Sequence, residues 1–268
     1  MPELPEVETV RRAMAAHLVG RRVVGVRTSG LKLRLPLPET PLRALCGARF
    51  AAARRRAKFL LLDTEDGRVV LIHLGMSGNL RFRTPGQPHD HVVFELDAGP
   101  PLVLADPRRF GLVQVLRREE ECACPHLRGL GVEPFDDGFD AAYLRRVCRG
   151  SRRPVKSTIM DARVVAGIGN LYASEALFRS GLRQTTPAGR LGHARLERLI
   201  GSIRQVLAAA IRAGGTTVGS WEGEGEGGSF QQQLAVYGRA GGACLVCDRP
   251  IVSQVLAGRS TYFCRRCQ

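Results

Sequence analysis

The first periodic segment of the chain covers residues 5–19 and has a helical pattern. Its apolar residues are spaced three and four positions apart, which is typical of a helix that buries one face. Gly20 follows directly and is a natural stop. These apolar residues are Val7, Val10, Met14 and Leu18.

Short apolar runs of strand character come next, and turn residues such as "EDG" and "DAGPP" separate them. Several short strands in the first part of a chain are typical of a β-sandwich or a β-barrel. We predict strands within residues 21–27, 58–63, 68–74, 91–97, 101–106 and 111–116.

The pattern changes after residues 129–140, "GLGVEPFDDGFD", which we interpret as a linker. Helical patterns then dominate, until a glycine-rich loop dotted with acids and a cysteine-bearing unit that begins near Gly238. We therefore predict a multi-domain α+β fold. The helices are expected within residues 141–150, 153–165, 170–181 and 194–215.

The net charge of the chain indicates which kind of molecule it binds. The 40 Lys and Arg residues exceed the 25 Asp and Glu residues, which gives a formal net charge of +15. Such an excess favours a polyanionic partner, with nucleic acid first and an anionic membrane second, although a merely basic surface is the alternative. The sequence has no apolar run of membrane-spanning length and no signal-peptide pattern, so we expect a bacterial-type cytoplasmic protein.

The last residues carry a metal-binding pattern. Four cysteines follow the spacing C-x2-C-x16-C-x2-C, which matches a four-thiolate zinc site that folds a unit too small for its own core. Disulfides or idle thiols are the alternatives, but disulfides are rare in the cytosol. We predict one structural Zn²⁺ bound by Cys244, Cys247, Cys264 and Cys267.

Eight blocks occur here in one order: "PELPEVETVRR", "RRRAKFLLL", "HLGMSG", "DPRRFG", "VAGIGNLYASE", "GGTT", "VYGR" and the paired CxxC. In them the chain resembles the formamidopyrimidine-DNA glycosylases, bacterial base-excision enzymes that remove oxidised purines such as 8-oxoguanine and then cleave the abasic site. The resemblance implies an N-terminal β-sandwich domain with a leading helix (2–132), a helix–two-turn–helix domain (133–225) and a zinc-finger β-hairpin (238–268). It also implies a monomer that binds damaged double-stranded DNA at the nucleoid.

The resemblance implies a catalytic role for the crowded N-terminus. Once Met1 is removed, as we expect in the cell, Pro2 would be the nucleophile, because an α-amine has a pKa of about 7.7–8.0 and is partly neutral at cellular pH. Glu3 would be the general acid-base, Glu6 a supporting carboxylate, and Lys58 a further catalytic residue. Glu3, Glu6 and Glu8 also suit the first turn of a helix, where the helix dipole favours negative charge.

The same resemblance implies residues that contact DNA. Met76, Arg108 and Phe110 would fill the gap left by the extruded base. Met76 and Phe110 could instead be core residues, but the glycine and polar residues around them favour loop tips. The other implied contacts are His73, His91, Arg109, Lys156, Asn170, Tyr237 and Arg259, and glycines before Asn170 would offer backbone N–H groups to phosphate.

One segment departs from the family pattern. The lesion-sensing loop corresponds to residues 217–230, "TVGSWEGEGEGGSF", whose glutamates would repel phosphate. Two rival functions stay open on the sequence. The first is an endonuclease VIII-like glycosylase for oxidised pyrimidines, whose typical "PEGPE" start is disfavoured by Leu4. The second is a non-catalytic zinc-dependent DNA-binding protein, which leaves Pro2 and Glu3 unexplained.

Overall fold

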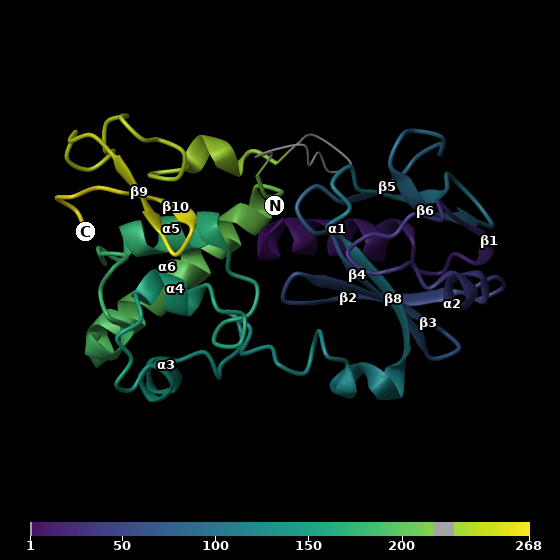
Figure 1. Cartoon of the computed structure of the whole chain (residues 1–268), viewed down its shortest axis with the longest axis horizontal. Coiled ribbons are helices and arrows are strands. Elements are labelled where there is room, and N and C mark those ends of the chain that lie inside the picture. Colours follow the sequence, from purple (N-terminus) through teal and green to yellow (C-terminus); the bar gives the residue numbers. More distant parts are fainter. Residues whose placement is uncertain (1, 217–227) are drawn as a thin grey trace. The chain divides into compact units, whose positions relative to one another are not determined.

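The structure is a computed structural model that describes residues 2–216 and 228–268 (Figure 1). Contacts group the described residues into two units, one of 2–128, 213–216 and 228–231, the other of 129–212 and 232–268. The helices are α1 (Leu4–His17), α2 (Glu39–Arg43), α3 (Ala141–Val147), α4 (Val155–Ile159), α5 (Asn170–Arg179) and α6 (His193–Arg212). The strands are β1 (Val23–Thr28), β2 (Phe50–Arg56), β3 (Phe59–Thr64), β4 (Arg68–His73), β5 (Asn79–Phe82), β6 (Asp90–Leu96), β7 (Leu102–Ala105), β8 (Leu112–Arg117), β9 (Val252–Leu256) and β10 (Arg259–Phe263).

The first unit contains two four-stranded antiparallel sheets. Their strand orders are β1-β6-β7-β5 and β2-β3-β4-β8. Apolar side chains of both sheets form one core, in which the rings of Phe50 and Phe94 meet edge to face at 6.2 Å. This arrangement confirms the predicted sandwich and all six predicted strands.

Helix α1 joins this core along one side, as its spacing predicts. Val7, Val10 and Met14 are buried in the same cluster as the strand residues. Figure 1 shows the purple helix running beside the strands of the first unit. Glu3 is the N-cap of this helix and Pro2 directly precedes it, so the packing of α1 fixes where both residues lie.

The second unit begins with residues 129–140, which contain no helix and only an isolated β-bridge between Val132 and Val165. These residues belong to the contact group of the helical unit, and their interpretation as a linker stays a prediction. Four helices follow, and α6 buries one face of its 20 residues. Helix α4 ends at Ile159, well before the predicted end at 165, and that prediction was wrong. Asp161 explains the early end, because its carboxylate accepts a hydrogen bond from the Arg163 N–H at 3.0 Å and turns the chain.

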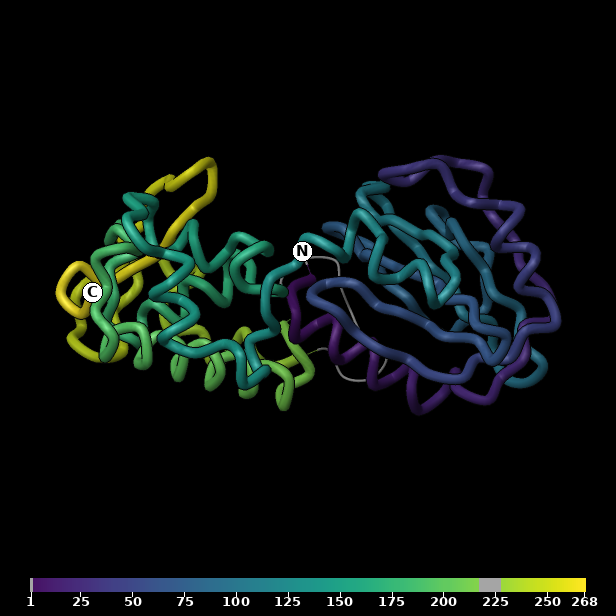
Figure 2. The backbone as a smooth tube through the Cα atoms, turned by 90° about the horizontal axis from the view of Figure 1, so that it is seen from below, coloured from purple at the N-terminus to yellow at the C-terminus, as the bar shows by residue number. Residues whose placement is uncertain are grey.

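The C-terminal strands β9 and β10 pair as an antiparallel hairpin, in which Arg259 faces Leu256 across the turn. In Figure 2 this yellow hairpin projects from the helices of its own unit. Its base packs on Phe178 and Ile251 around the buried cysteines. The hairpin is therefore anchored at one end and exposed at its tip.

The chain returns to the first unit after α6. Thr216 pairs with Ser229 in an isolated β-bridge, and both belong to the contact group of the first unit. The domain boundaries expected at 132, 225 and 238 stay a prediction. Within residues 2–216 and 228–268, no helix combines the length and apolarity that crossing a membrane requires.

Candidate active site and nucleic-acid interface

The N-terminal site is built by the first turn of α1. Pro2 and Glu3 are both buried, and Glu3 has extended backbone angles at the N-cap of the helix. The Glu3 N–H donates to Glu6 Oε2 at 2.8 Å. Glu6 therefore satisfies a backbone donor that a helix start leaves open, and it fixes the backbone on which Pro2 and Glu3 sit.

Glu6 has a second set of partners, far along the sequence. Its Oε1 accepts hydrogen bonds from the Thr216 N–H at 3.0 Å and the Thr216 hydroxyl at 3.2 Å. Gly215, with φ +83°, approaches so closely that a Cβ there would lie 3.0 Å from Glu6 Oε1. The predicted supporting role of Glu6 thus has a geometric basis, since one buried carboxylate joins the helix start to the returning chain.

A basic cluster lies where β4 ends. His73 Nδ1 accepts a hydrogen bond from the Gly75 N–H at 2.9 Å, and its ring packs 4.9 Å from that of Phe59. Burial first, and then the charges of Lys58, Arg34 and His126, lower the pKa of His73 to about 4. His73 is therefore neutral at physiological pH and can offer its Nε2–H to an acceptor such as a phosphate oxygen.

Two loops of the first unit carry the residues expected to fill the DNA gap. Met76 and Phe110 are 42% and 46% exposed, so neither side chain belongs to the core. The Arg108 guanidinium lies 5.0 Å from the centre of the Phe110 ring. The alternative of core packing is therefore wrong for both apolar residues, and an exposed wedge beside a cation suits an unstacked base pair.

The buried carboxylate of Asp106 forms hydrogen bonds with both loops. Asp106 is fully buried, and its carboxylate accepts from the Ser77 hydroxyl at 2.6 Å and the Gly111 N–H at 2.7 Å. His91 is 1% exposed, and its two ring nitrogens lie 3.0 Å from Ser29 Oγ and 3.1 Å from the Asp106 carbonyl oxygen. The predicted DNA contact of His91 stays a prediction, and the structure places this residue in the support of the loop.

Arg109 belongs to the same loop. Its backbone has φ +54°, a left-handed conformation that residues other than glycine seldom adopt, and its side chain is exposed. Its predicted DNA contact is thus compatible with its position.

The helical unit brings three further predicted residues together. Lys156 is 2% exposed and its Nζ donates to Thr261 Oγ1 at 2.7 Å, while Asn170 Nδ2 donates to the Ser260 carbonyl at 2.9 Å. Together with Arg259 they line a pocket of about 240 Å³. The buried Oδ1 of Asn170 has no partner among the described residues.

Asn170 is the first residue of α5, whose N-cap is Gly169, so the sequence-based placement of Asn170 as the cap was one residue late. Its amide still lies at the helix N-terminus, where backbone N–H groups favour an anion.

Tyr237 is positioned by a residue that the sequence reasoning missed. Glu175 on α5 is fully buried, and its carboxylate accepts from three successive N–H groups: Ala235 at 2.9 Å, Val236 at 3.0 Å and Tyr237 at 2.8 Å. The Tyr237 ring lies 5.1 Å from that of Tyr262 on β10. Glu175 lies in the "NLYASE" block, but nothing in its spacing indicates that distant partner.

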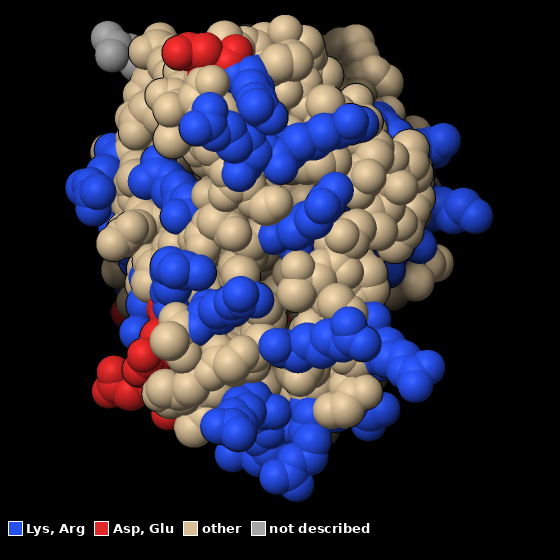
Figure 3. All heavy atoms as spheres, turned by 90° about the vertical axis from the view of Figure 1, so that its left-hand side faces the viewer, with Lys and Arg blue, Asp and Glu red and all other residues tan. Residues whose placement is uncertain are grey.

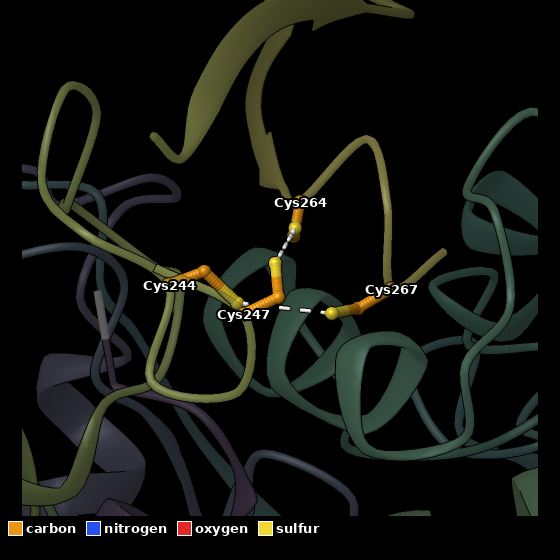
Figure 4. A group of neighbouring side chains, drawn as sticks. All are labelled: Cys244, Cys247, Cys264 and Cys267. Atoms are coloured by element: carbon orange, nitrogen blue, oxygen red, sulfur yellow. Dashed lines mark hydrogen bonds between the residues drawn. The ribbon is translucent and has the colours of Figure 1, made fainter. Parts of the chain in front are cut away.

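The four predicted zinc ligands converge (Figure 4). Their sulfur atoms all lie within 4.8 Å of one another, and the separations Cys244–Cys267 and Cys247–Cys264 are 3.9 and 3.4 Å. A tetrahedral site with Zn–S bonds of about 2.3 Å needs sulfur separations of about 3.8 Å, whereas a disulfide needs about 2.05 Å. The four thiols therefore fit one structural zinc ion and do not form disulfides.

Comparison with known families covers most of the chain. Residues 1–113 match the formamidopyrimidine-DNA glycosylase N-terminal domain, residues 130–221 match the H2TH domain of the same glycosylases, and residues 241–268 match the zinc finger found in FPG and IleRS. The chain belongs to the formamidopyrimidine-DNA glycosylase family. This finding confirms the resemblance, the α+β multi-domain fold and the zinc-finger hairpin that the sequence predicts.

Curated relatives match the chain over their full length. The chain is 48% identical over 272 residues to a formamidopyrimidine-DNA glycosylase of Methylococcus capsulatus, and the match covers 100% of both proteins. A second, from Thioalkalivibrio sulfidiphilus, is also 48% identical with full coverage of both. Both relatives are bacterial.

Solved structures agree with the fold. The MutM (Fpg) protein of Thermus thermophilus has a TM-score of 0.89 and 39% identity, and the match covers 100% of this chain and 98% of that one. A Lactococcus lactis FPG mutant in complex with a Fapy-dG-containing DNA has a TM-score of 0.93 and 30% identity, with 100% and 99% covered. The roles of individual site residues stay predictions.

Proposed function

We propose that this protein is a bifunctional DNA glycosylase and AP lyase of base-excision repair, which removes oxidised purines such as 8-oxoguanine and formamidopyrimidines from duplex DNA. The observation that carries the proposal is the buried N-terminus, where Pro2 and Glu3 stand on a helix start that Glu6 fixes at 2.8 Å. Full-length similarity to glycosylases of this family supports it. A DNA-binding protein without catalysis has no need of such a site.

The chemistry follows from a secondary amine next to a carboxyl group. Pro2 nitrogen attacks C1′ of the damaged nucleotide, the N-glycosidic bond breaks, and the base leaves with its bonding electrons and takes up the proton that the amine loses. Glu3 delivers a proton to the sugar ring oxygen, and the opened sugar becomes an iminium joined to Pro2. The iminium accepts electrons when the C2′ proton passes to solvent and β-elimination expels the 3′ phosphate. Loss of the C4′ proton to solvent then allows δ-elimination of the 5′ phosphate, and water finally releases the sugar fragment from Pro2.

Extruding the base leaves a gap in the stack. Met76 and Phe110 supply exposed apolar groups for it, and Arg108 supplies hydrogen-bond donors for the unpaired base opposite. Neutral His73 and Lys58, whose charge helps to lower the pKa of His73, are suited to the backbone phosphates. In the helical unit, Lys156, Asn170 and Arg259 line the pocket of about 240 Å³, which is suited to a backbone phosphate, and Tyr237 is held beside the hairpin.

Zinc supplies structure in this scheme. When bound by the four cysteines, it fixes the base of the hairpin so that β10 can present Arg259. We propose that the protein acts as a monomer with the predicted domains 2–132, 133–225 and 238–268. Because its substrate is chromosomal DNA, it would work in the cytoplasm at the nucleoid.

An excision panel tests the proposal. Protein whose N-terminal residue is verified as Pro2 is incubated with duplexes that carry 8-oxoguanine, formamidopyrimidine or thymine glycol, and with an undamaged duplex. We expect strand cleavage at both oxidised purines with phosphate left at both ends of the gap. Preference for thymine glycol would instead support the pyrimidine-specific rival, and binding without cleavage of any duplex would support a non-catalytic protein.

A further inference from the structure

The helical unit contains a second pocket that the glycosylase site does not use. It has a volume of about 410 Å³ and lies between the end of α3 and the segment that leads into α6. Three of the residues that line it are arginines. The full lining is Arg145, Cys148, Arg149, Gly150, Ala188, Gly189, Arg190, Leu191 and Gly192.

The charge of this pocket is not neutralised by the protein. No acidic residue lines it, and within the described residues the side chains of Arg145, Arg149 and Arg190 make no hydrogen bond or ion pair. By contrast, Arg153 and Arg163 nearby both bind Asp161 at 2.8 Å. Three like charges around one hollow repel each other, and an anion placed among them would relieve that repulsion.

A solvated basic face is the simple alternative, and Arg145 also suits the C-terminal end of α3. Two features favour a binding site. The backbone that lines it is closely packed, because the Gly189 N–H donates to the Ser151 carbonyl at 3.0 Å and a Cβ on Gly189 would lie 2.8 Å from the Cys148 carbonyl oxygen. In addition, Gly192 directly precedes the 20-residue helix α6, whose N-terminal end adds positive potential at the rim.

We propose that this pocket, which we call the arginine pocket, binds backbone phosphates of duplex DNA that flanks the lesion. The proposal rests on the proposed function, since it extends the DNA path of the same enzyme. Phosphodiester is the ligand class because guanidinium groups match phosphate oxygens in shape and charge.

The chain itself links the arginine pocket to the phosphate pocket of Lys156. Arg149 lines the first and Arg153 the second. Four residues span at most about 14 Å, and phosphates of one DNA strand recur about every 3.4 Å along the helix axis. The two pockets are therefore close enough for one duplex to reach both within a few base pairs. Figure 3 views the molecule from the left-hand side of Figure 1 and shows a face on which Lys and Arg side chains are numerous and acids few.

Salt dependence of binding on duplexes of two lengths tests the proposal. The variant carries Arg145→Gln, Arg149→Gln and Arg190→Gln, and the lesion lies at the centre of duplexes of about 10 and about 25 base pairs. Each lost phosphate contact lowers the slope of log K against log salt by about 0.9. We expect the slope to become shallower by about 2 to 3 on the long duplex and by less on the short one, which ends closer to the lesion.

A matched variant separates the pocket from net charge. Arg179→Gln, Arg195→Gln and Arg198→Gln remove the same charge from exposed residues of this unit outside the pocket. We expect this control to keep the wild-type slope on both duplexes. Equal slopes in the pocket variant, the control and the wild type on the long duplex would overturn the proposal.

Two further readouts interpret a failure. Excision of 8-oxoguanine by the wild type on the short duplex tests the proposed function separately. If the wild type does not excise 8-oxoguanine, the proposed function is rejected. If it does and the slopes are unchanged, only the proposed role of the arginine pocket is rejected. Thermal unfolding with inorganic phosphate and without DNA tests whether the pocket binds free phosphate instead of the phosphates of DNA. A phosphate-induced rise in Tm that the pocket variant lacks, together with unchanged DNA slopes, would assign the pocket to free phosphate and overturn a DNA contact.

Discussion

Ser77 Oγ donates a hydrogen bond of 2.6 Å to Asp106 Oδ1, and both residues are buried. This bond joins the loop that carries Met76 to the loop that carries Arg108 and Phe110. Because the Asp106 carboxylate also accepts from the Gly111 N–H at 2.7 Å, a single buried group fixes both loops. We infer that the gap-filling residues enter DNA as one preformed unit.

Ser77→Ala should therefore weaken lesion excision more than later steps. The variant leaves a buried carboxylate oxygen short of a partner, which costs about 1–3 kcal/mol. We expect kcat/KM for 8-oxoguanine excision to fall by about tenfold, with a much smaller effect on cleavage of a preformed abasic site. Single-turnover kinetics on both substrates measure this.

The control is Ser180→Ala, which removes another buried hydroxyl, bonded to the Leu177 carbonyl at 3.1 Å on α5. It should lose stability without a selective loss of excision. Equal losses on both substrates in Ser77→Ala would show that the bond serves only stability.

Glu3→Gln should bind lesion DNA with nearly wild-type affinity and lose base excision. Gln has a similar shape and keeps the helix start, but it cannot deliver a carboxylic proton. A positioned acid contributes about 10² to 10⁴ in rate, so we expect a loss in that range. Binding and single-turnover excision are measured on the same preparation.

Glu8→Gln is the matched control on the same helix, since Glu8 pairs with Arg11 at 2.9 Å and lies outside the proposed chemistry. It should retain excision. If Glu3→Gln cleaves within a few-fold of wild type, Glu3 acts only at the helix start.

The lowered pKa of His73 predicts that the free energy of unfolding depends on pH. Its pKa is lowered to about 4 in the folded protein and is about 6.5 in the unfolded chain. Protons bind the unfolded state first as pH falls, so this contribution to stability is complete above pH 6.5 and is lost between about 6.5 and 4. We expect the free energy of unfolding to fall by about 1 kcal/mol between about pH 7.5 and 5.5 from this group alone.

The measurement is chemical denaturation of wild type and His73→Gln at both pH values. Gln can still accept from the Gly75 N–H but does not titrate, so the variant should lose this part of the pH dependence. His193→Gln is the control, because that ring is 57% exposed. An identical pH dependence in wild type and His73→Gln would contradict the inferred neutrality of His73.

Zinc removal should abolish DNA binding more than it destabilises the rest of the chain. The hairpin is fixed at its base by the cysteines, whereas the sandwich and the helices have their own buried cores. Circular dichroism and DNA binding are measured on one chelated sample with verified metal loss. Tight binding that persists without zinc would remove Arg259 and the hairpin from the interface.

Periodicity was enough to predict much of this fold. Strands whose apolar residues form runs, such as β3 and β4, stand out in the sequence. Strand β2, "FAAARRR", does not, because its side chains are mostly alanine and arginine and only pairing with β3 makes it a strand. Strand β5 has just four residues, which is too short for the alternation of apolar and polar residues to identify it.

The chemistry-bearing residues were predicted through blocks of sequence, but their supports were not. The Glu6–Thr216 bond and the contacts of Glu175 with residues 235–237 join positions far apart in the chain, which local spacing cannot indicate. Asp106 lies inside a recognised block, yet its bonds to Ser77 and His91 join it to other segments of the chain. Part of the expected lesion-sensing loop, residues 217–227, lies outside the described residues.

The covalent step is the centre of this account, and borohydride trapping tests it most directly. Wild-type protein with a verified N-terminal Pro2 is mixed with an 8-oxoguanine duplex and borohydride, and the cross-linked peptide is identified by mass spectrometry. We predict an adduct on Pro2 that Pro2→Gly strongly diminishes, while Lys58→Gln still forms it. An undiminished adduct in Pro2→Gly, or an adduct mapped to Lys58, would contradict the proposed nucleophile.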